Sequence, residues 1–177
     1  MSLRSVATVS MLAALLGTSA SLAQQTPPPN PLDVIPEKMP FDVPYGTPIS
    51  LDRAEAVIAA AVAESKKRDW KEVIAVVDTG GHLVALQRMD GAAIASTKIA
   101  EHKARAAAIF RRETKAFENG IQLSGFTYLL TLDDIIASRG GIPLVEGGKL
   151  IGAIGCSGGT GSQDEVVCKA GAATINK

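Results

Sequence analysis

Two histidines are the side chains of this sequence best suited to chemistry near neutral pH, because an imidazole can ligate a metal or exchange a proton. His82 follows a glycine pair at the start of an expected strand, and His102 lies within an expected helix beside Glu101. The plainer interpretations are an exposed turn residue for His82 and a histidine satisfied by a neighbour for His102. No HExxH or other paired-ligand spacing is present, so the sequence does not predict a dedicated zinc site.

A second candidate group ends the first expected hairpin, where Arg88 and Asp90 stand just before the helix that carries His102. An arginine binds a carboxylate through parallel N–H groups, and the unpaired N–H groups at a helix start attract anions. One hypothesis is an enzyme or sensor for a small hydroxy or oxo acid, with a pocket of Arg88, Asp90, Glu101 and His102. There His102 is the acid or base and Glu101 orients it. A structural ion pair is the alternative.

The stretch "SGGTGSQDE", residues 157–165, raises the same question before the last expected helix. Its glycines expose N–H groups that either form an anion cradle or belong to a capped loop between a strand and a helix. It is not a P-loop, because no Gly-Lys-Ser/Thr follows. A GxSxG strand-to-helix motif is also absent, which disfavours a serine hydrolase.

The chain length of 177 residues indicates one domain, and the first segment has the features of a leader rather than of the fold. Residues 1–23 combine Arg4, an apolar run over Val6–Leu16 and small residues before Gln24, the layout of a secretory signal peptide. A membrane anchor is the alternative, but the run is short for a span of about 20 residues. We therefore expect a periplasmic or secreted protein with no membrane attachment after signal cleavage.

Charge and cysteine content limit the classes of partner and cofactor that the sequence favours. Loss of Arg4 leaves 17 basic and 18 acidic residues, so no attraction to nucleic acid or anionic lipid is expected. Cys156 and Cys168 are either a disulfide of an oxidising compartment or two buried thiols. The sequence has no CxxCH motif, which excludes covalent attachment of a c-type haem.

Eight of the nine prolines lie within residues 27–48. Proline lacks an N–H group and fixes φ, so residues 24–48 are expected to form an extended N-terminal arm rather than a helix or central strand. The arm is either a disordered spacer or lies, through its scattered apolar side chains, on its own domain or a neighbouring subunit. The compact domain is expected over residues 49–177.

Apolar periodicity in this domain predicts helices packed on an antiparallel sheet, an α+β layout. Helices are expected at residues 50–68, 96–111, 131–137 and 162–175, and strands at 73–78, 82–89, 141–146 and 149–156.

Local signals refine these elements. Capping-box spacing joins Thr131 to Asp134 and Ser162 to Glu165, at the starts of the last two expected helices. In the second expected strand, alternation places His82, Val84, Leu86 and Arg88 on one face and Leu83, Ala85, Gln87 and Met89 on the other.

Three stretches taken together resemble the GlcG/HbpS-like haem-binding family: "AVVDTGGHLVALQRMDGA", "IASTKIAEHKARAAAIFRRET" and "GGIPLVEGGKLIGAIGCSGGTGSQDEVVCKAG". The resemblance covers about Leu51–Ala173. Arg105 and Ala106 stand where many relatives have a Thr-Ala-like pair, and Cys156 stands where valine is common. The resemblance implies a profilin-like domain with a five-stranded antiparallel sheet and a homo-oligomer, often a tetramer or octamer. Some relatives bind or degrade haem, and others accompany corrinoid or glycolate enzymes.

The resemblance also implies noncovalent haem b as the leading ligand, with the haem iron as the only metal. The family's haem ligands differ between relatives, so no axial ligand is carried over by position. The side chains expected to contact the cofactor are His102 and His82 as alternative iron ligands, with Arg88, Asp90, Lys103 and Arg105, and Arg111 as a further cation for the propionates. The chain has only four Phe, two Tyr and one Trp, which favours a shallow or intersubunit site.

Overall fold

The structure is a computed structural model that describes residues 30–39 and 41–176, so the expected signal peptide and the first residues of the arm lie outside the described residues. The chain divides into two compact units, residues 1–37 and 38–177. In the first, the side chain of Asn30 caps a short 3-10 helix, η1 (Pro31–Asp33), by accepting a hydrogen bond from the Leu32 N–H. Within the described residues no helix is both long and apolar enough to cross a bilayer.

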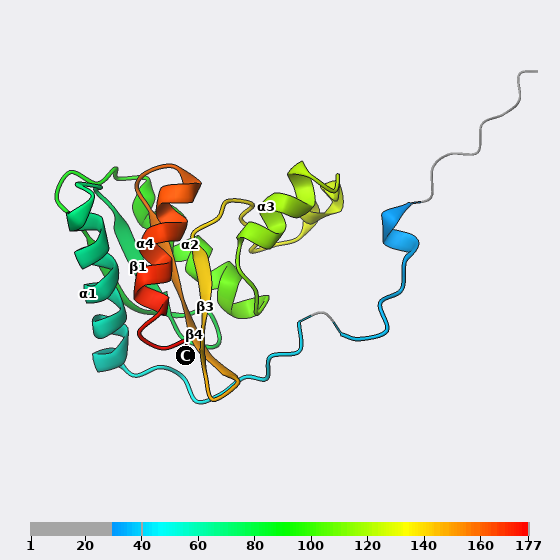
Figure 1. The fold of residues 1–177 in the computed structure, drawn as a ribbon, viewed down its shortest axis with the longest axis horizontal. Coiled ribbons are helices and arrows are strands. Elements are labelled where there is room, and N and C mark those ends of the chain that lie inside the picture. Colours follow the sequence, from blue (N-terminus) through cyan, green and yellow to red (C-terminus); the bar gives the residue numbers. More distant parts are fainter. Residues whose placement is uncertain (1–29, 40, 177) are drawn as a thin grey trace, which may run out of the picture. The chain divides into compact units, whose positions relative to one another are not determined.

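The second unit is an α+β fold, which confirms the expected class (Figure 1). Its elements are α1 (Leu51–Lys67), β1 (Val73–Val77), β2 (Leu83–Arg88), α2 (Ser96–Ile109), α3 (Lys115–Gln122), η2 (Thr127–Thr131), β3 (Gly141–Glu146), β4 (Lys149–Ser157) and α4 (Gly161–Ala172). The strands form one antiparallel sheet in the order β2-β1-β4-β3. In the described chain this sheet has four strands, where five were expected.

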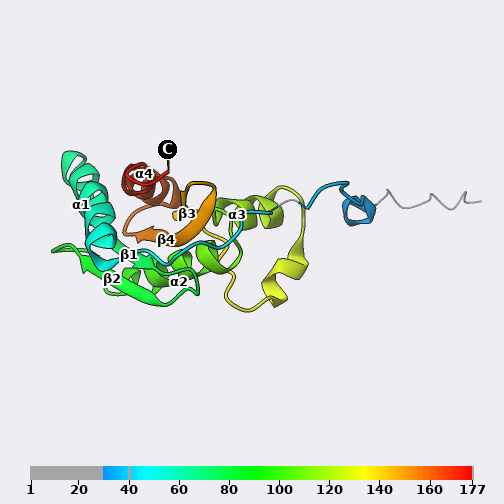
Figure 2. The same cartoon turned by 90° about the horizontal axis from the view of Figure 1, so that it is seen from below.

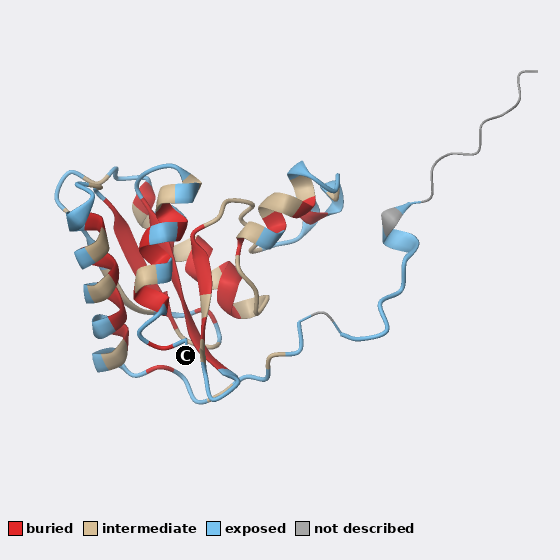
Figure 3. Ribbon diagram, in the orientation of Figure 1, coloured by how far each residue is buried: buried red, intermediate tan, exposed pale blue. Residues whose placement is uncertain are grey.

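Helices cover both faces of the sheet, as the view from below shows (Figure 2). Helices α1 and α4 pack on one face, against alternate residues such as Ile74 and Val76 of β1. Helix α2 packs on the other face, against Val73, Ala75 and Val77. Strand β1 is therefore buried along its whole length, and burial is concentrated in the sheet and the inner helix faces (Figure 3).

Small side chains let α2 approach the sheet closely. Its inner face carries alanines, among them Ala100 and Ala104, and these oppose Gly155 of β4. A methyl group on Gly155 would overlap the Ala100 carbonyl oxygen and the Ala104 amide nitrogen. The backbone contact fixes α2 against the sheet, because a larger side chain at either side would force the layers apart.

Strand β2 departs from simple alternation. Val76 pairs with Ala85 and Val77 pairs with Leu83, which leaves Val84 as the extra residue of a bulge. As a result Val84 and Ala85 both pack towards α1 and α4, while Leu86 packs towards α2. The expectation that Val84 and Leu86 share one face is therefore wrong.

The expected helix at residues 131–137 is also wrong. The chain instead forms the 3-10 helix η2, and a loop follows in which Asp134 has a φ of 62°. An α-helix cannot continue through this left-handed conformation. The Asp134 carboxylate is bound by Arg105 rather than serving as a helix cap. Helix α3, which precedes this loop, was not expected.

The last helix begins slightly earlier than expected, and a different pair caps it. The capping box of α4 joins Thr160 and Gln163, not Ser162 and Glu165. Ser162 lies inside the helix, and the Glu165 carboxylate pairs instead with Lys115 of α3 and Lys169 of α4.

Part of the N-terminal arm lies on its own domain. Tyr45 forms an isolated parallel bridge with Leu150, and its hydroxyl donates to the Ile109 carbonyl at the end of α2, at 3.0 Å. Arg111, whose φ of 53° ends that helix, donates to the Val43 carbonyl at 3.0 Å. These contacts confirm docking on the arm's own domain for residues 43–45.

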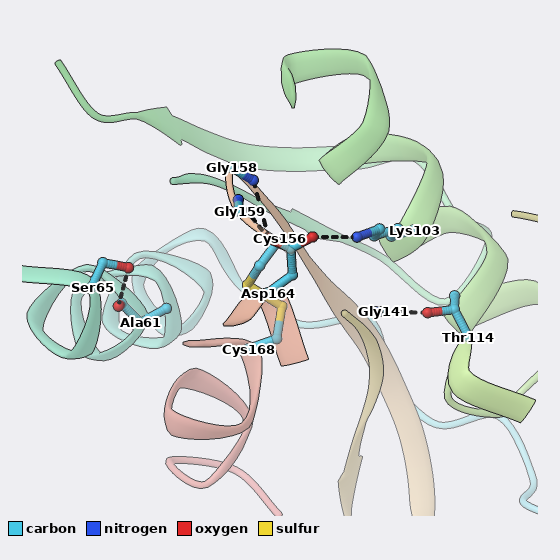
Figure 4. Close-up of a disulfide and its surroundings, with 10 residues drawn as sticks. All are labelled: Ala61, Ser65, Lys103, Thr114, Gly141, Cys156, Gly158, Gly159, Asp164 and Cys168. Atoms are coloured by element: carbon cyan, nitrogen blue, oxygen red, sulfur yellow. Dashed lines mark hydrogen bonds and ion pairs between the residues drawn. A yellow bond between two sulfur atoms is a disulfide. The ribbon is translucent and has the colours of Figure 1, made fainter. Parts of the chain in front are cut away.

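Cys156 of β4 and Cys168 of α4 form a disulfide with a Cα–Cα distance of 5.6 Å, so the alternative of two free thiols is wrong (Figure 4). Both residues are fully buried in the core shared by α1, α4 and the sheet. The bond ties the last strand to the last helix, which leaves the end of the chain attached to the middle of the sheet.

Removing the disulfide is expected to lower the free energy of unfolding by about 3 kcal/mol, because the bond closes a loop of 12 residues in the unfolded chain. Urea unfolding of the Cys156→Ala, Cys168→Ala double variant, compared with the oxidised protein, measures this loss. The reduced wild-type protein serves as the control, since it has no bond but keeps both sulfur atoms. Equal stability of oxidised and reduced protein would contradict the prediction.

Candidate functional site

A shallow pocket of about 280 Å³ lies on the outer face of α2. Lys98, Glu101, His102 and Arg105 line it at helical spacing, and Asp134 closes one side from the loop after η2. Residues three and four apart share one face of a helix, and the opposite face of α2 is occupied by alanines against the sheet. The helix therefore turns these four side chains outward together.

Arg105 organises one side of this pocket. Its Nε and Nη2 atoms donate to the two carboxylate oxygens of Asp134, at 2.8 and 3.2 Å, and its Nη1 donates to the Gly81 carbonyl at 3.4 Å. The guanidinium thus connects α2 to the turn between β1 and β2 and to the loop after η2. Its hydrogen bonds hold the pKa of Asp134 below the ordinary value, and the nearby His102 contributes in the same direction.

In the pocket, the Nε2 atom of His102 is a buried polar atom without a hydrogen-bond partner among the described residues. Nearby, the Lys98 Nζ lies 3.5 Å from a Glu101 carboxylate oxygen, and the Lys98 side chain is 88% exposed. The pocket therefore combines a nitrogen able to act as ligand, acid or base with two cations, Lys98 and Arg105.

His82 lies outside this pocket lining, at the turn between β1 and β2, with its side chain 78% exposed. Its Nδ1 is 3.3 Å from Asp78, whose other carboxylate oxygen accepts hydrogen bonds from the N–H groups of Gly80 and His82. Burial raises the pKa of Asp78, but these donors outweigh it and the pKa lies below its ordinary value. The Asp78 carboxylate explains the turn without a ligand.

Arg88 and Asp90 line a different pocket, of about 350 Å³, together with Lys66 and Lys71. The expected single pocket of Arg88, Asp90, Glu101 and His102 is therefore wrong in this chain. Helix α2 runs back along β2, so that Arg105 meets Gly81 at the start of β2, away from the Arg88 end.

Lys103 and Arg111 are committed to structural contacts. Lys103 is 1% exposed and its Nζ lies 2.6 Å from an Asp164 carboxylate oxygen (Figure 4). Position 103 faces the sheet and α4, not the pocket, so the expected role of Lys103 as a surface cation for a propionate is wrong. Arg111 is held by the arm, through the Val43 carbonyl and the ring of Tyr45.

The N–H groups of the glycine-rich loop before α4 are already bound by side chains of that helix. The N–H groups of Gly158 and Gly159 both donate to Asp164 at 3.1 Å (Figure 4). The Thr160 N–H donates to Gln163 at 2.9 Å. These side chains of α4 take the place of an external anion. The capped-loop interpretation is confirmed, and the anion cradle is not free in this structure.

Sequence reasoning missed Asp134 and Glu72. Asp134 was assigned to a helix cap, and no local signal links it to Arg105, 29 residues earlier. Glu72 precedes β1 and is fully buried, and neither of its carboxyl oxygens has a hydrogen-bond partner in the described chain. Burial, followed by the charge of Asp164, raises the pKa of Glu72 to about 8. Its position next to the β-branched run of β1 was the one signal available, although an unpaired acid is rarely fully buried.

Comparison with known proteins finds a matching family model and similar sequences. A family model described as "Haem degrading protein HbpS-like" matches residues 49–173. Protein GlcG of Escherichia coli (strain K12) is 46% identical over 109 residues, which cover 62% of this chain and 81% of GlcG.

Two solved structures have a similar fold. The crystal structure of HbpS matches with a TM-score of 0.68 at 27% identity, covering 79% of this chain and 99% of HbpS. The crystal structure of a PduOC:heme complex matches with a TM-score of 0.66 at 26% identity, covering 73% of this chain and 96% of PduOC. The family match spans nearly the whole compact domain and its fold is the one found here, so the chain belongs to the HbpS-like family.

Proposed function

We propose that this protein binds haem noncovalently at the α2 pocket, as an exported homo-oligomer. The observation that carries the proposal is the buried and unpartnered Nε2 of His102 in a pocket that also holds Lys98 and Arg105. Membership of a family described by haem degradation, and similarity to a structure solved with heme, support haem as the ligand class.

The residues of the pocket fit the chemistry of haem. A neutral imidazole nitrogen is a common axial ligand, and cations suit the two propionates. His102 would ligate the iron, while Lys98 and Arg105 would hold the propionates. Bound haem would supply iron-centred redox or oxygen chemistry, and the chain's own part is to hold, orient and shield it.

The size of the pocket supports an oligomeric site. Its volume of about 280 Å³ lies at the lower limit of pockets that enclose small molecules, roughly 300 Å³. A flat porphyrin would need a second covering surface. Exposed apolar side chains close to or within α2, Ile94 and Ile99, offer contact area to another copy of the chain. A tetramer or octamer would bring such surfaces together.

Export is supported by two independent features. Residues 1–23 have the layout of a signal peptide, and the Cys156–Cys168 disulfide belongs to an oxidising compartment. We therefore propose a periplasmic or secreted location for the mature protein.

Hemin titration tests the function directly. The purified protein is expected to shift and sharpen the Soret band of hemin to saturation, because His102 supplies an iron ligand. His102→Ala is expected to lose the ligated spectrum, while His82→Ala keeps it, since His82 lies outside the pocket. Titration without a saturable spectral change would rule the proposal out, and a spectrum unchanged in His102→Ala would rule out His102 as the ligand.

A further inference from the structure

Asp134 occupies the binding face of the one guanidinium in the α2 pocket lining. The two carboxylate oxygens of Asp134 accept from Nε and Nη2 of Arg105, in the forked geometry by which arginine also binds a ligand carboxylate. Asp134 comes from a loop, and its φ of 62° is a left-handed conformation that aspartate tolerates at a small cost. The pair therefore joins a rigid helix to an irregular segment.

This ion pair is weak enough to be exchanged. The side chains of Arg105 and Asp134 are 37% and 38% exposed, and pairs in contact with water contribute between zero and about 1 kcal/mol. The pair between Lys103 and Asp164 differs, because those side chains are only 1% and 3% exposed and water cannot compensate its loss. A carboxylate arriving from solvent could replace Asp134 on Arg105 but could not replace Asp164.

The loop that carries Asp134 also lies next to His102. Ile135, Ile136 and Ala137 pack against an apolar cluster that includes Ala106, one helical turn beyond His102. The Nε2 atom of His102 is buried, has no hydrogen-bond partner in the described chain, and belongs to the same pocket lining as Asp134. The Arg105–Asp134 pair connects this loop to the pocket face of α2.

We propose that Asp134 is a resident carboxylate that a carboxylate-bearing ligand displaces from Arg105. The inference rests on the proposed function and names the contact that the carboxylate of the ligand replaces. The ligand class is a molecule that carries both a carboxylate for Arg105 and a group for the His102 nitrogen. Haem fits this class, because its propionates are carboxylates.

Asp134→Asn tests the exchange, because asparagine tolerates the same left-handed φ and only the charge is lost. Two probes are used with the full chain, namely hemin and hemin dimethyl ester, in which both propionates are esterified. Asp134→Asn is expected to lower the Kd for hemin by about two- to fivefold, the worth of an exposed ion pair, and to leave the Kd for the ester unchanged. Glu146→Gln, which disrupts the exposed pair with Arg53, is the matched control and should change neither Kd.

The Arg105→Gln background completes the test as a double-mutant cycle. Arg105→Gln is expected to weaken hemin binding, and adding Asp134→Asn to it should then have no further effect. An unchanged hemin Kd in Asp134→Asn, an equal gain for both probes, or a gain that persists without Arg105 would each overturn the exchange and leave haem binding intact. Failure of every variant and the wild type to bind hemin would instead overturn the proposed function, and the exchange with it.

Discussion

Replacing Asp164 with alanine is expected to lower the free energy of unfolding by about 3–5 kcal/mol, because it removes the carboxylate that pairs with the buried Lys103 ammonium. Asp164 lies 2.6 Å from Lys103, and both side chains are almost fully inaccessible. The same carboxylate accepts the N–H groups of Gly158 and Gly159, so the variant also leaves two donors of the α4 loop unpaired.

Urea unfolding followed by circular dichroism measures the effect. Asp164→Asn, which keeps an acceptor for the loop but not the charge, should fall between wild type and Asp164→Ala. Asp134→Asn removes the charge of a partly exposed ion pair, tolerates the left-handed φ, and should cost less than about 1 kcal/mol. Similar losses for Asp164→Asn and Asp134→Asn would show that burial does not set the strength of these pairs.

Glu72→Gln is expected to make the protein more stable than wild type at pH 8 and above. The folded-state pKa of Glu72 is about 8, raised from its ordinary value of 4.5 by burial and then by the charge of Asp164, with Lys103 opposing. A raised acid pKa means that the stabilising contribution is complete below pH 4.5 and is lost as pH rises through 8. Across that window the loss is on the order of 5 kcal/mol, at about 1.4 kcal/mol for each pH unit.

Comparing how the unfolding free energies of wild type and Glu72→Gln depend on pH isolates the contribution of the Glu72 carboxyl. Glutamine keeps the shape of the protonated carboxyl and cannot ionise, so the difference in unfolding free energy between Glu72→Gln and wild type should grow steadily from pH 5 to 8. Glu55→Gln, on the exposed side of α1, is a control that should run parallel to wild type. Parallel profiles for Glu72→Gln and wild type would show that Glu72 ionises normally in the folded protein.

Much of the frame was predictable because it depends on local patterns. The two Gly-Gly hairpins, the helix beginning at Ser96 and the buried strand at β1 follow from turn glycines, alanine-rich periodicity and β-branched runs. Other features could not be predicted because they depend on a partner far away in the sequence. Thr131 and Asp134 have the spacing of a helix cap, but Arg105 binds Asp134 and the helix does not form.

The candidate site was predictable only in part for the same reason. Glu101, His102 and Arg105 share a helix, so their clustering follows from a spacing of three to four residues. Arg88 and Asp90 are close in sequence to the same helix, yet they line another pocket because α2 reverses direction after the hairpin. The burial of Lys103 depends on how α4 returns to the sheet, which no pattern around residue 103 reveals.

The two faces of α2 have a consequence for how such proteins diversify. Its inner alanines touch the sheet backbone at Gly155 and tolerate almost no change, while its outer side chains at 98, 101, 102 and 105 line a shallow pocket. Substitutions on the outer face therefore change the lining of the pocket at a small cost in folding, such as the loss of the partly exposed Arg105–Asp134 pair. The pocket lining can vary by point mutation while the alanine face keeps the helix on the sheet.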